Sequence, residues 1–320
     1  MAIVTNAFST FTAIGIREDL TDVIYDISPT ETPFMSNIAR VKATQKVHEW
    51  QVDSLAAAAA NAQLEGNTIA GAAVTPTSRL KNQTQISYKA YSVTGTTEAS
   101  DAAGRSSEIA YLTAKYGKEL KRDMEKTLTG ETGSNAATTA ATARTLAGLE
   151  AWLSTNKTHL GTAGTTPGFV TSTGLVTAVT DSTGTVAATE TQLKSIIQAC
   201  WTAGGDPNVI MVGPTTKQDY SAFSGIATLF KNAPAGQATI VGAADLYVSD
   251  FGQHSIVPNR FSRDATALIL DMSMWAVAYL RPMHTFDLAK TGDAETKVIL
   301  AEYTLESRNE ASSGKIAEIT

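Results

Sequence analysis

The chain has 320 residues, of which 43% are hydrophobic, enough for one large core or two moderate ones. Its 25 basic and 31 acidic residues give a formal net charge of -6, which argues against a domain dedicated to gripping nucleic acid. A single cysteine, Cys200, excludes an internal disulfide framework and any zinc site built from several cysteines.

The hydropathy pattern predicts neither a secretory signal nor a membrane-spanning segment. The first 20 residues lack a basic start followed by an apolar run and a small-residue cleavage site, so we expect no secretory signal and a cytoplasmic chain. The most apolar stretch, residues 265–280, is too short to span a bilayer and carries Asp271 in its middle. We interpret it as buried strands.

The N-terminal region predicts a short helix over residues 16–27, with a narrow apolar stripe formed by Leu20, Val23, Ile24 and Ile27. Pro29 ends this helix, and Pro33 pushes the residue before it toward extended geometry. The three apolar residues that follow are therefore expected to continue away from this helix and not to fold back on it. They are Phe34, Met35 and Ile38. They pack either on the core of their own chain or on another surface, and the residues alone leave both alternatives open.

Residues 41–100 predict a ribbon of two strands, residues 46–55 and 82–96, joined by a low-complexity tip at residues 56–79. The tip has few large aliphatic side chains, which are Leu64, Ile69 and Val74. Because an isolated two-stranded ribbon is marginal in water, we expect this projection to need a partner surface, on this chain or on another.

The longest predicted helix covers residues 106–129 and ends at Gly130. One buried face is marked by Ile109, Leu112, Tyr116, Leu120, Met124 and Leu128. The remaining positions are charged and include Glu125, which could pair with Lys121 at i, i+4. We interpret the charged positions as a solvated face, or alternatively as the face of a rod that meets neighbours.

Residues 130–188 predict loops and short strands with one short helix near 145–156, anchored by Trp152, Leu153, Phe169, Leu175 and Val176. A compact α/β unit follows over residues 189–270, with helices that open in Thr-x-x-Gln patterns at Thr189 and Thr215. Its strands are expected at VIMVG, LYVSD, HSIVP and ALILD. Residues 271–320 are dominated by strands and predict a hairpin that turns at Gly292 and Asp293.

The sequence offers no catalytic, metal or cofactor site. The four histidines are dispersed, and no acidic cluster has ligand spacing. The GPTTK stretch at 213–217 lacks the spacing of a phosphate loop. Cys200 lies on the apolar stripe of its predicted helix, which favours a packed thiol over a nucleophile.

Several stretches together resemble the major capsid proteins of tailed bacteriophages, in particular those of certain short-tailed phages. They are DLTDVIYDISPTETPFMSNI near the N-terminus and, near the C-terminus, SDFG, IVPNRF, LRP and LAKTGDAETKVILAEYTLESRNEAS. The resemblance covers nearly the whole chain and is weakest over 130–188. It implies an α+β fold in five parts: an N-terminal arm (1–40), an extended two-stranded loop (41–100), a peripheral domain with a long spine helix (101–188), an axial domain (189–270), and peripheral strands with the C-terminal segment (271–320).

The function implied by this resemblance is that of a non-enzymatic subunit of an icosahedral virion capsid. Such subunits assemble with themselves into pentamers and hexamers in the host cytoplasm and enclose double-stranded DNA without sequence-specific binding. Scaffold, portal or decoration proteins would be further partners. The resemblance places the arm and the extended loop across adjacent subunits, so the expected contact residues are Pro29, Pro33, Phe34, Met35, Ile38, Leu64, Ile69, Val74 and Arg79.

Two other functions stay open on the sequence. One is another self-assembling structural protein, such as a tail-tube or surface-layer subunit. The other is a cytoplasmic α/β enzyme with its site around residues 213–220. Electron microscopy separates these classes, because they form closed shells, tubes or sheets, and small oligomers respectively.

Overall fold

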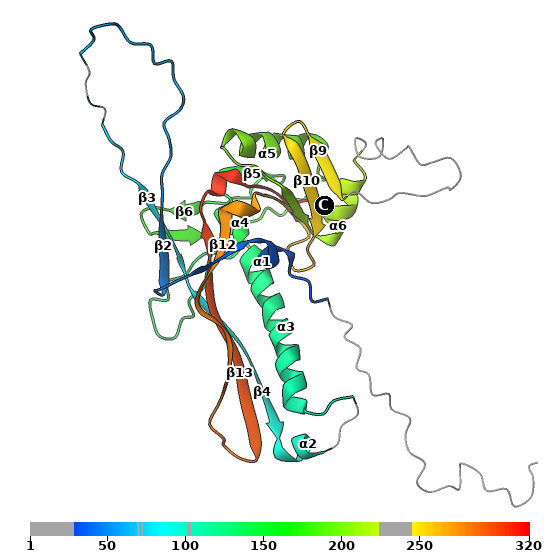
Figure 1. Ribbon diagram of the computed structural model, residues 1–320. Helices are drawn as coiled ribbons and strands as arrows, with labels where there is room; N and C mark the ends of the chain where they lie inside the picture. Colours follow the sequence, from blue (N-terminus) through cyan, green and yellow to red (C-terminus); the bar gives the residue numbers. More distant parts are fainter. Residues whose placement is uncertain (1–28, 69–70, 72, 101–103, 224–244) are drawn as a thin grey trace, which may run out of the picture.

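The computed structural model describes residues 29–68, 71, 73–100, 104–223 and 245–320. Figure 1 shows two sheets, a long helix beside the lower one, and an extended loop that leaves the body. The helix predicted over residues 16–27 lies outside the described residues. Within them, no helix is long and apolar enough to cross a membrane.

The lower sheet has four strands in the order β1-β12-β13-β4. They are β1 (Ala39–Lys42), β4 (Gln85–Thr94), β12 (Trp275–Asp287) and β13 (Ala294–Ser307). The hairpin predicted at the C-terminal end is confirmed, since β12 and β13 pair antiparallel with Asp287 opposite Lys297. Strand β4 pairs antiparallel with β13, and β1 pairs parallel with β12. The sheet therefore joins two strands from the first third of the chain to two from the last.

The long helix α3 (Glu108–Thr129) packs against β4 and β13 (Figure 1). Its prediction is confirmed at both ends: Ser107 caps the N-terminus by accepting a hydrogen bond from the Ala110 amide, and Gly130 is the C-cap. The buried face is also as predicted, with Leu120, Met124 and Leu128 in the core. A further helix, α2 (Gly95–Ala99), precedes it.

The upper sheet has six strands in the order β5-β14-β11-β8-β10-β9. Their bounds are β5 (Asn156–His159), β8 (Val209–Val212), β9 (Leu246–Ser249), β10 (Gly252–Pro258), β11 (Thr266–Leu270) and β14 (Gly314–Ala317). The four strands predicted within 189–270 are all present. The other two strands, β5 and β14, come from outside that range of the sequence. Strand β14 pairs with β11 on one side and with β5 on the other, which extends the sheet.

Two helices pack against the upper sheet, α5 (Glu190–Thr202) and α6 (Pro214–Ser221). The capping box predicted at Thr189 is confirmed. The one predicted at Thr215 is wrong, because α6 begins one residue earlier with Pro214 in its first turn. The side chain of Asp264 accepts the Thr215 amide instead, at 2.9 Å.

The ribbon is formed by β2 (Val47–Val52) and β3 (Ser78–Gln83), which pair antiparallel from Val47 opposite Gln83 to Val52 opposite Ser78. Its second strand was predicted too far along the chain. Most of residues 82–96 instead form β4 and pair with β13, where Tyr91 and Val93 find a buried face. The ribbon proper is thus shorter than predicted.

Residues 130–188 contain short elements, as predicted. They are α4 (Leu149–Trp152), β5, and the hairpin of β6 (Gly168–Val170) with β7 (Leu175–Thr177). Two further 3-10 turns cover Met272–Met274 and Glu310–Ser312.

The described residues form two hydrophobic clusters that share the upper sheet. Ile210, Val212 and Ile269 face the cluster that includes α5 and α6. Met211, Leu268 and Leu270 belong to the cluster that includes α3 and the lower sheet. Because residues adjacent along a strand point to opposite faces, β8 and β11 divide the two clusters.

Candidate functional site

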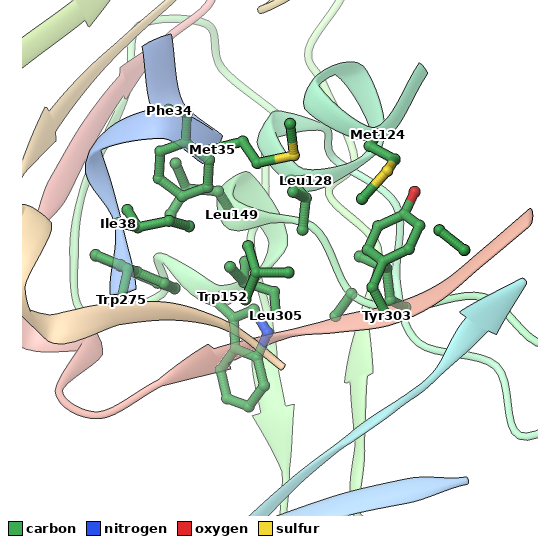
Figure 2. Close-up of a cluster of buried hydrophobic side chains, with 14 of the residues drawn as sticks. Phe34, Met35, Ile38, Met124, Leu128, Leu149, Trp152, Trp275, Tyr303 and Leu305 are labelled. Carbon is green, nitrogen blue, oxygen red and sulfur yellow. The ribbon is translucent and has the colours of Figure 1, made fainter. Parts of the chain in front are cut away.

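The segment after Pro33 belongs to the core of its own chain. Residues Pro33–Asn37 form a single-turn helix, α1, and the following residues form β1. Figure 2 shows Phe34, Met35 and Ile38 within one cluster of buried side chains that includes Leu128, Leu149 and Trp275. Their exposed fractions are 0%, 6% and 6%. The expectation that these three side chains contact an adjacent subunit is therefore wrong: β1 pairs with β12, which draws them inward.

Glu125 fixes this segment to the long helix. Its carboxylate accepts hydrogen bonds from the amides of Phe34 at 2.7 Å and Met35 at 2.8 Å. It also accepts one from Nδ2 of Asn259 at 2.8 Å. Two of the amides at the start of α1, which have no partner within a helix, are thus satisfied. Burial raises the pKa of Glu125, although these donors act in the opposite direction.

Sequence reasoning missed Glu125, because it predicted a solvated charge at this position. The structure buries the whole side chain. The only signal in the sequence is positional: Glu125 follows Met124 on the helix and so lies at the edge of the apolar face. That signal does not identify its partners, which lie 90 and 134 residues away.

The base of the ribbon is held by the body of the same chain. Nε1 of Trp50 donates to the Ser307 carbonyl at 2.7 Å, and the Trp50 ring packs on Trp152 with centroids 5.7 Å apart. Nδ2 of the buried Asn82 donates to the Leu305 carbonyl at 2.8 Å. The two strands are thus stabilised by tertiary contacts, which an isolated hairpin would lack.

The tip of the ribbon, residues 53–77, contrasts with its base. Its large apolar side chains are almost fully exposed: Leu55 at 99%, Leu64 at 82% and Val74 at 92%. Among the described residues of the tip, the hydrogen bonds are made within the ribbon, as between Gln63 and Asn61 at 2.7 Å and between Thr77 and Gln51 at 3.3 Å. Figure 1 shows this connection extending away from both sheets. Exposed apolar side chains of this kind are typical of an interaction surface, and no described part of the same chain covers them.

The remaining expected contact residues are divided. Pro29 and Pro33 are partly buried at the start of the described chain. Arg79, on β3, is exposed and pairs with Glu49 across the ribbon at 3.3 Å. Ile69 lies outside the described residues. The structure thus groups Leu64, Val74 and Arg79 on the projection and separates them from the Phe34 segment.

The described side chains around residues 213–220 make structural contacts. Tyr220 is fully buried, and burial raises the pKa of its hydroxyl. The Lys217 ammonium donates to the Ile256 carbonyl at 3.1 Å, which ties α6 to β10. The prediction of a packed thiol is confirmed, since Cys200 is fully buried and burial raises its pKa to about 12.

The histidines of the described chain have separate structural partners. His159 bonds to Glu318 at 3.1 Å and His48 to Glu306 at 2.8 Å. His254 is buried beside the Pro207 carbonyl, and His284 bonds to the Pro282 carbonyl at 2.8 Å. In the part of the chain that the structure covers, no three His, Cys, Asp or Glu residues are grouped as metal ligands.

An ionic cluster surrounds the buried Glu150 of α4 and connects it to the loop after β10 and to β14. Arg263, which follows β10, pairs with Glu150 at 3.2 Å and also with Glu131 and Asp181. The Lys315 ammonium donates to the Glu150 backbone carbonyl at 2.9 Å. Burial raises the pKa of the Glu150 carboxyl to about 7, and burial lowers the pKa of Lys315 to about 8. The cluster ties the lower and upper parts of the molecule together.

This combination of fold and projecting ribbon is that of a phage capsid subunit. The structure is similar to a chain of the cyanophage A-1(L) capsid asymmetric unit, with TM-score 0.68, 13% identity and 98% of each chain covered. It is also similar to the capsid of a native GTA particle, with TM-score 0.62, 12% identity, 99% of this chain and 100% of the other covered. A third similar structure comes from Mycobacterium phage Bobi, with TM-score 0.61, 10% identity, and 94% and 95% of the two chains covered.

Comparison of the sequence identifies the family to which the protein belongs. The chain belongs to the SU10 major capsid protein family, which matches residues 3–320. It is 27% identical over 344 residues to the major capsid protein of Escherichia phage Phieco32, covering 96% of this chain and 95% of that one. The resemblance to phage major capsid proteins is thereby confirmed, and the protein is a structural subunit of a virion capsid.

Proposed function

We propose that this subunit assembles with itself into pentamers and hexamers of a closed icosahedral shell, and that the ribbon tip is a main contact between neighbours. Assembly takes place in the host cytoplasm. The contact residues are Leu64, Ile69, Val74 and Arg79 on the ribbon, with Pro29 and Pro33 at the start of the described chain. The observation that carries the proposal is the exposure of the tip while its base is anchored.

The outer face of the lower sheet supplies apolar surface for such a contact. Tyr91 and Val93 of β4 face the core, and the Tyr91 hydroxyl lies near Thr113 of α3. The alternate residues Ile86 and Tyr88 therefore point away from α3 and are 44% and 63% exposed. On β12, Phe286 is 38% exposed. These side chains are an apolar face that a neighbouring copy can cover.

The enclosed genome is double-stranded DNA, and the wall meets it without reading sequence. A net charge of -6 supports this, because a wall that neutralised many phosphates would hold the DNA during packaging and release. Scaffold, portal or decoration proteins act as further partners. The proposed role needs no catalytic step and no cofactor.

The test replaces the tip, residues 54–77, with a short Gly-Ser turn. This change removes Leu55, Leu64 and Val74 and keeps every residue of β2 and β3. We expect a soluble subunit with unchanged thermal unfolding that no longer forms shells in electron micrographs. The interfaces recur around a closed shell, so a small loss in each has a large summed effect.

The matched control is Trp50→Ala at the ribbon base. It removes a side chain that packs on Trp152 and donates to Ser307, so we expect an unfolding free energy lower by about 3 kcal/mol. Shells of normal yield and heat resistance from the tip replacement would show that the tip is not an intersubunit contact.

A further inference from the structure

An open groove of about 890 Å³ lies between α3, β4 and the loop that follows β10. Five basic and three acidic side chains line it, so it carries a net positive charge on a chain that is acidic overall. The acidic ones are Glu119, Asp123 and Glu131. The capsid role described above does not use this groove.

Only part of the positive charge is neutralised from within. Lys89 pairs with Asp123 at 2.8 Å, and Arg263 pairs with Glu131. Within the described chain, the other three basic side chains form no ion pair; they are Arg122, Lys126 and Arg260. The Arg122 guanidinium lies over the Phe261 ring, 5.3 Å from its centroid, which holds it at the groove.

The N-terminal residues enter the fold beside this groove. The amides of Phe34 and Met35 bond to Glu125, which lies next to Lys126 and three residues after Arg122 on the same helix. Twenty-eight residues precede the described chain. At roughly 3.3 Å per residue, the half-dozen residues before Pro33 alone can span about 20 Å. The groove is within reach of the segment that contains residues 17–28.

The charge pattern of that segment is complementary to the groove. Residues 17–28 contain one basic residue, Arg17, and four acidic ones, Glu18, Asp19, Asp22 and Asp26. In a helix, Asp19, Asp22 and Asp26 share one face, because they are spaced i, i+3 and i+7. Three carboxylates on one face match the three basic side chains that have no ion pair in the described chain.

We propose that the acidic segment of residues 17–28 docks in this groove on its own subunit, with its carboxylates against Arg122, Lys126 and Arg260. The arm is then fixed to its own subunit along α3 as well as at Glu125. This segment is favoured over phosphate groups of DNA because its attachment at Glu125 holds it beside the groove at a high effective concentration.

The test uses the full chain with the cysteine pair Asp22→Cys and Lys126→Cys, unassembled and dilute, under mild oxidation. The native Cys200 is fully buried and does not compete. The matched control pairs Asp22→Cys with Arg308→Cys, which lies outside the groove at the end of β13. We expect the first pair to form an internal disulfide at least tenfold faster. Raising the salt from 0.1 to 1 M should slow it several-fold, since the screening length falls from about 10 to about 3 Å.

A second measurement needs no new cysteine. Docking should shield Arg17 from trypsin, so the double variant Arg122→Glu, Lys126→Glu should be cleaved there at least threefold faster than the unmodified chain. Equal rates in either experiment would overturn the proposal. Crosslinked dimers in place of an internal disulfide would assign the groove to the arm of a second copy. Suppression of the crosslink by a short DNA duplex would assign it to phosphate.

Discussion

Glu125 holds the start of α1 on α3 through two backbone amides. Glu125→Ala would leave two backbone amides without partners and remove one of the two hydrogen bonds of Asn259 Nδ2 in a buried site, so we expect the unfolding free energy to fall by about 2 to 4 kcal/mol. Glu125→Gln keeps one oxygen as an acceptor and should lose less. Urea unfolding of the unassembled subunit measures both, with the exposed Lys121→Ala as control. Equal stability of Glu125→Ala and Lys121→Ala would refute this role.

Glu150 predicts how stability depends on pH. Its pKa rises from 4.5 to about 7 on folding, so the folded state binds the proton more tightly than the unfolded chain. The resulting stability is fully present below pH 4.5 and is lost as the pH rises through about 7. We expect a decrease of about 3 kcal/mol between pH 5 and 8 that is absent in Glu150→Gln.

The control for this measurement is Glu131→Gln, which removes another carboxylate beside Arg263 but from a more exposed position. It should keep most of the decrease between pH 5 and 8. The prediction fails if Glu150→Gln and the unmodified chain have parallel stability curves over this range.

These two carboxylates also show where sequence reasoning reaches its limit. The cap at Thr189 could be predicted, because both of its partners lie within four residues. Glu125 and Glu150 could not, since their environment is created by residues at least 90 positions away or by Arg263 on another element. At Thr215 the local pattern was present but Asp264, far along the chain, provided the cap instead. Interactions between residues close in sequence can be predicted from the sequence, whereas burial by distant segments cannot.

The helix α1 and strand β1 predict a sharp difference between two truncations. Deleting residues 1–28 leaves every described contact in place, so it should lower the unfolding temperature of the subunit far less than the longer deletion. Deleting residues 1–38 also removes Phe34, Met35 and Ile38 from the core, which should cost on the order of 5 kcal/mol. Differential scanning calorimetry compares the two. Similar unfolding of both truncations would mean that α1 does not belong to the core.

Among the elements, α3 and the C-terminal hairpin were predictable from apolar periodicity and turn residues. The ribbon was only partly predictable. Residues 82–96 have the alternation of a strand, but that alternation cannot say which strand they pair with. The choice of β13 over β2 is made by Tyr91 and Val93, which are buried toward α3. The burial of Phe34 was not predictable for the same reason. An apolar side chain is compatible both with a contact to a neighbouring subunit and with the core of its own chain.

Assembly should stabilise the subunit as a whole. Contacts made only by the folded subunit raise its apparent stability in proportion to their strength and number. We therefore expect shells to unfold at a higher temperature than isolated subunits. In the variant whose tip, residues 54–77, is replaced, this difference should shrink or vanish while the isolated subunit is unchanged. Light scattering with calorimetry follows both transitions. A shell that unfolds at the temperature of its free subunit would contradict this expectation.

The composition of the lower sheet has a consequence for the order of events during synthesis. Its strand β1 ends at Lys42, and the partner strand β12 begins only at Trp275. At about 5 to 20 residues per second, a ribosome needs roughly 10 to 50 s to make the intervening chain. During that time the base of the ribbon lacks Ser307 and Leu305, its anchors on β13. The ribbon of a chain that is still being translated therefore lacks its anchors on β13. Only completed chains can assemble into the shell.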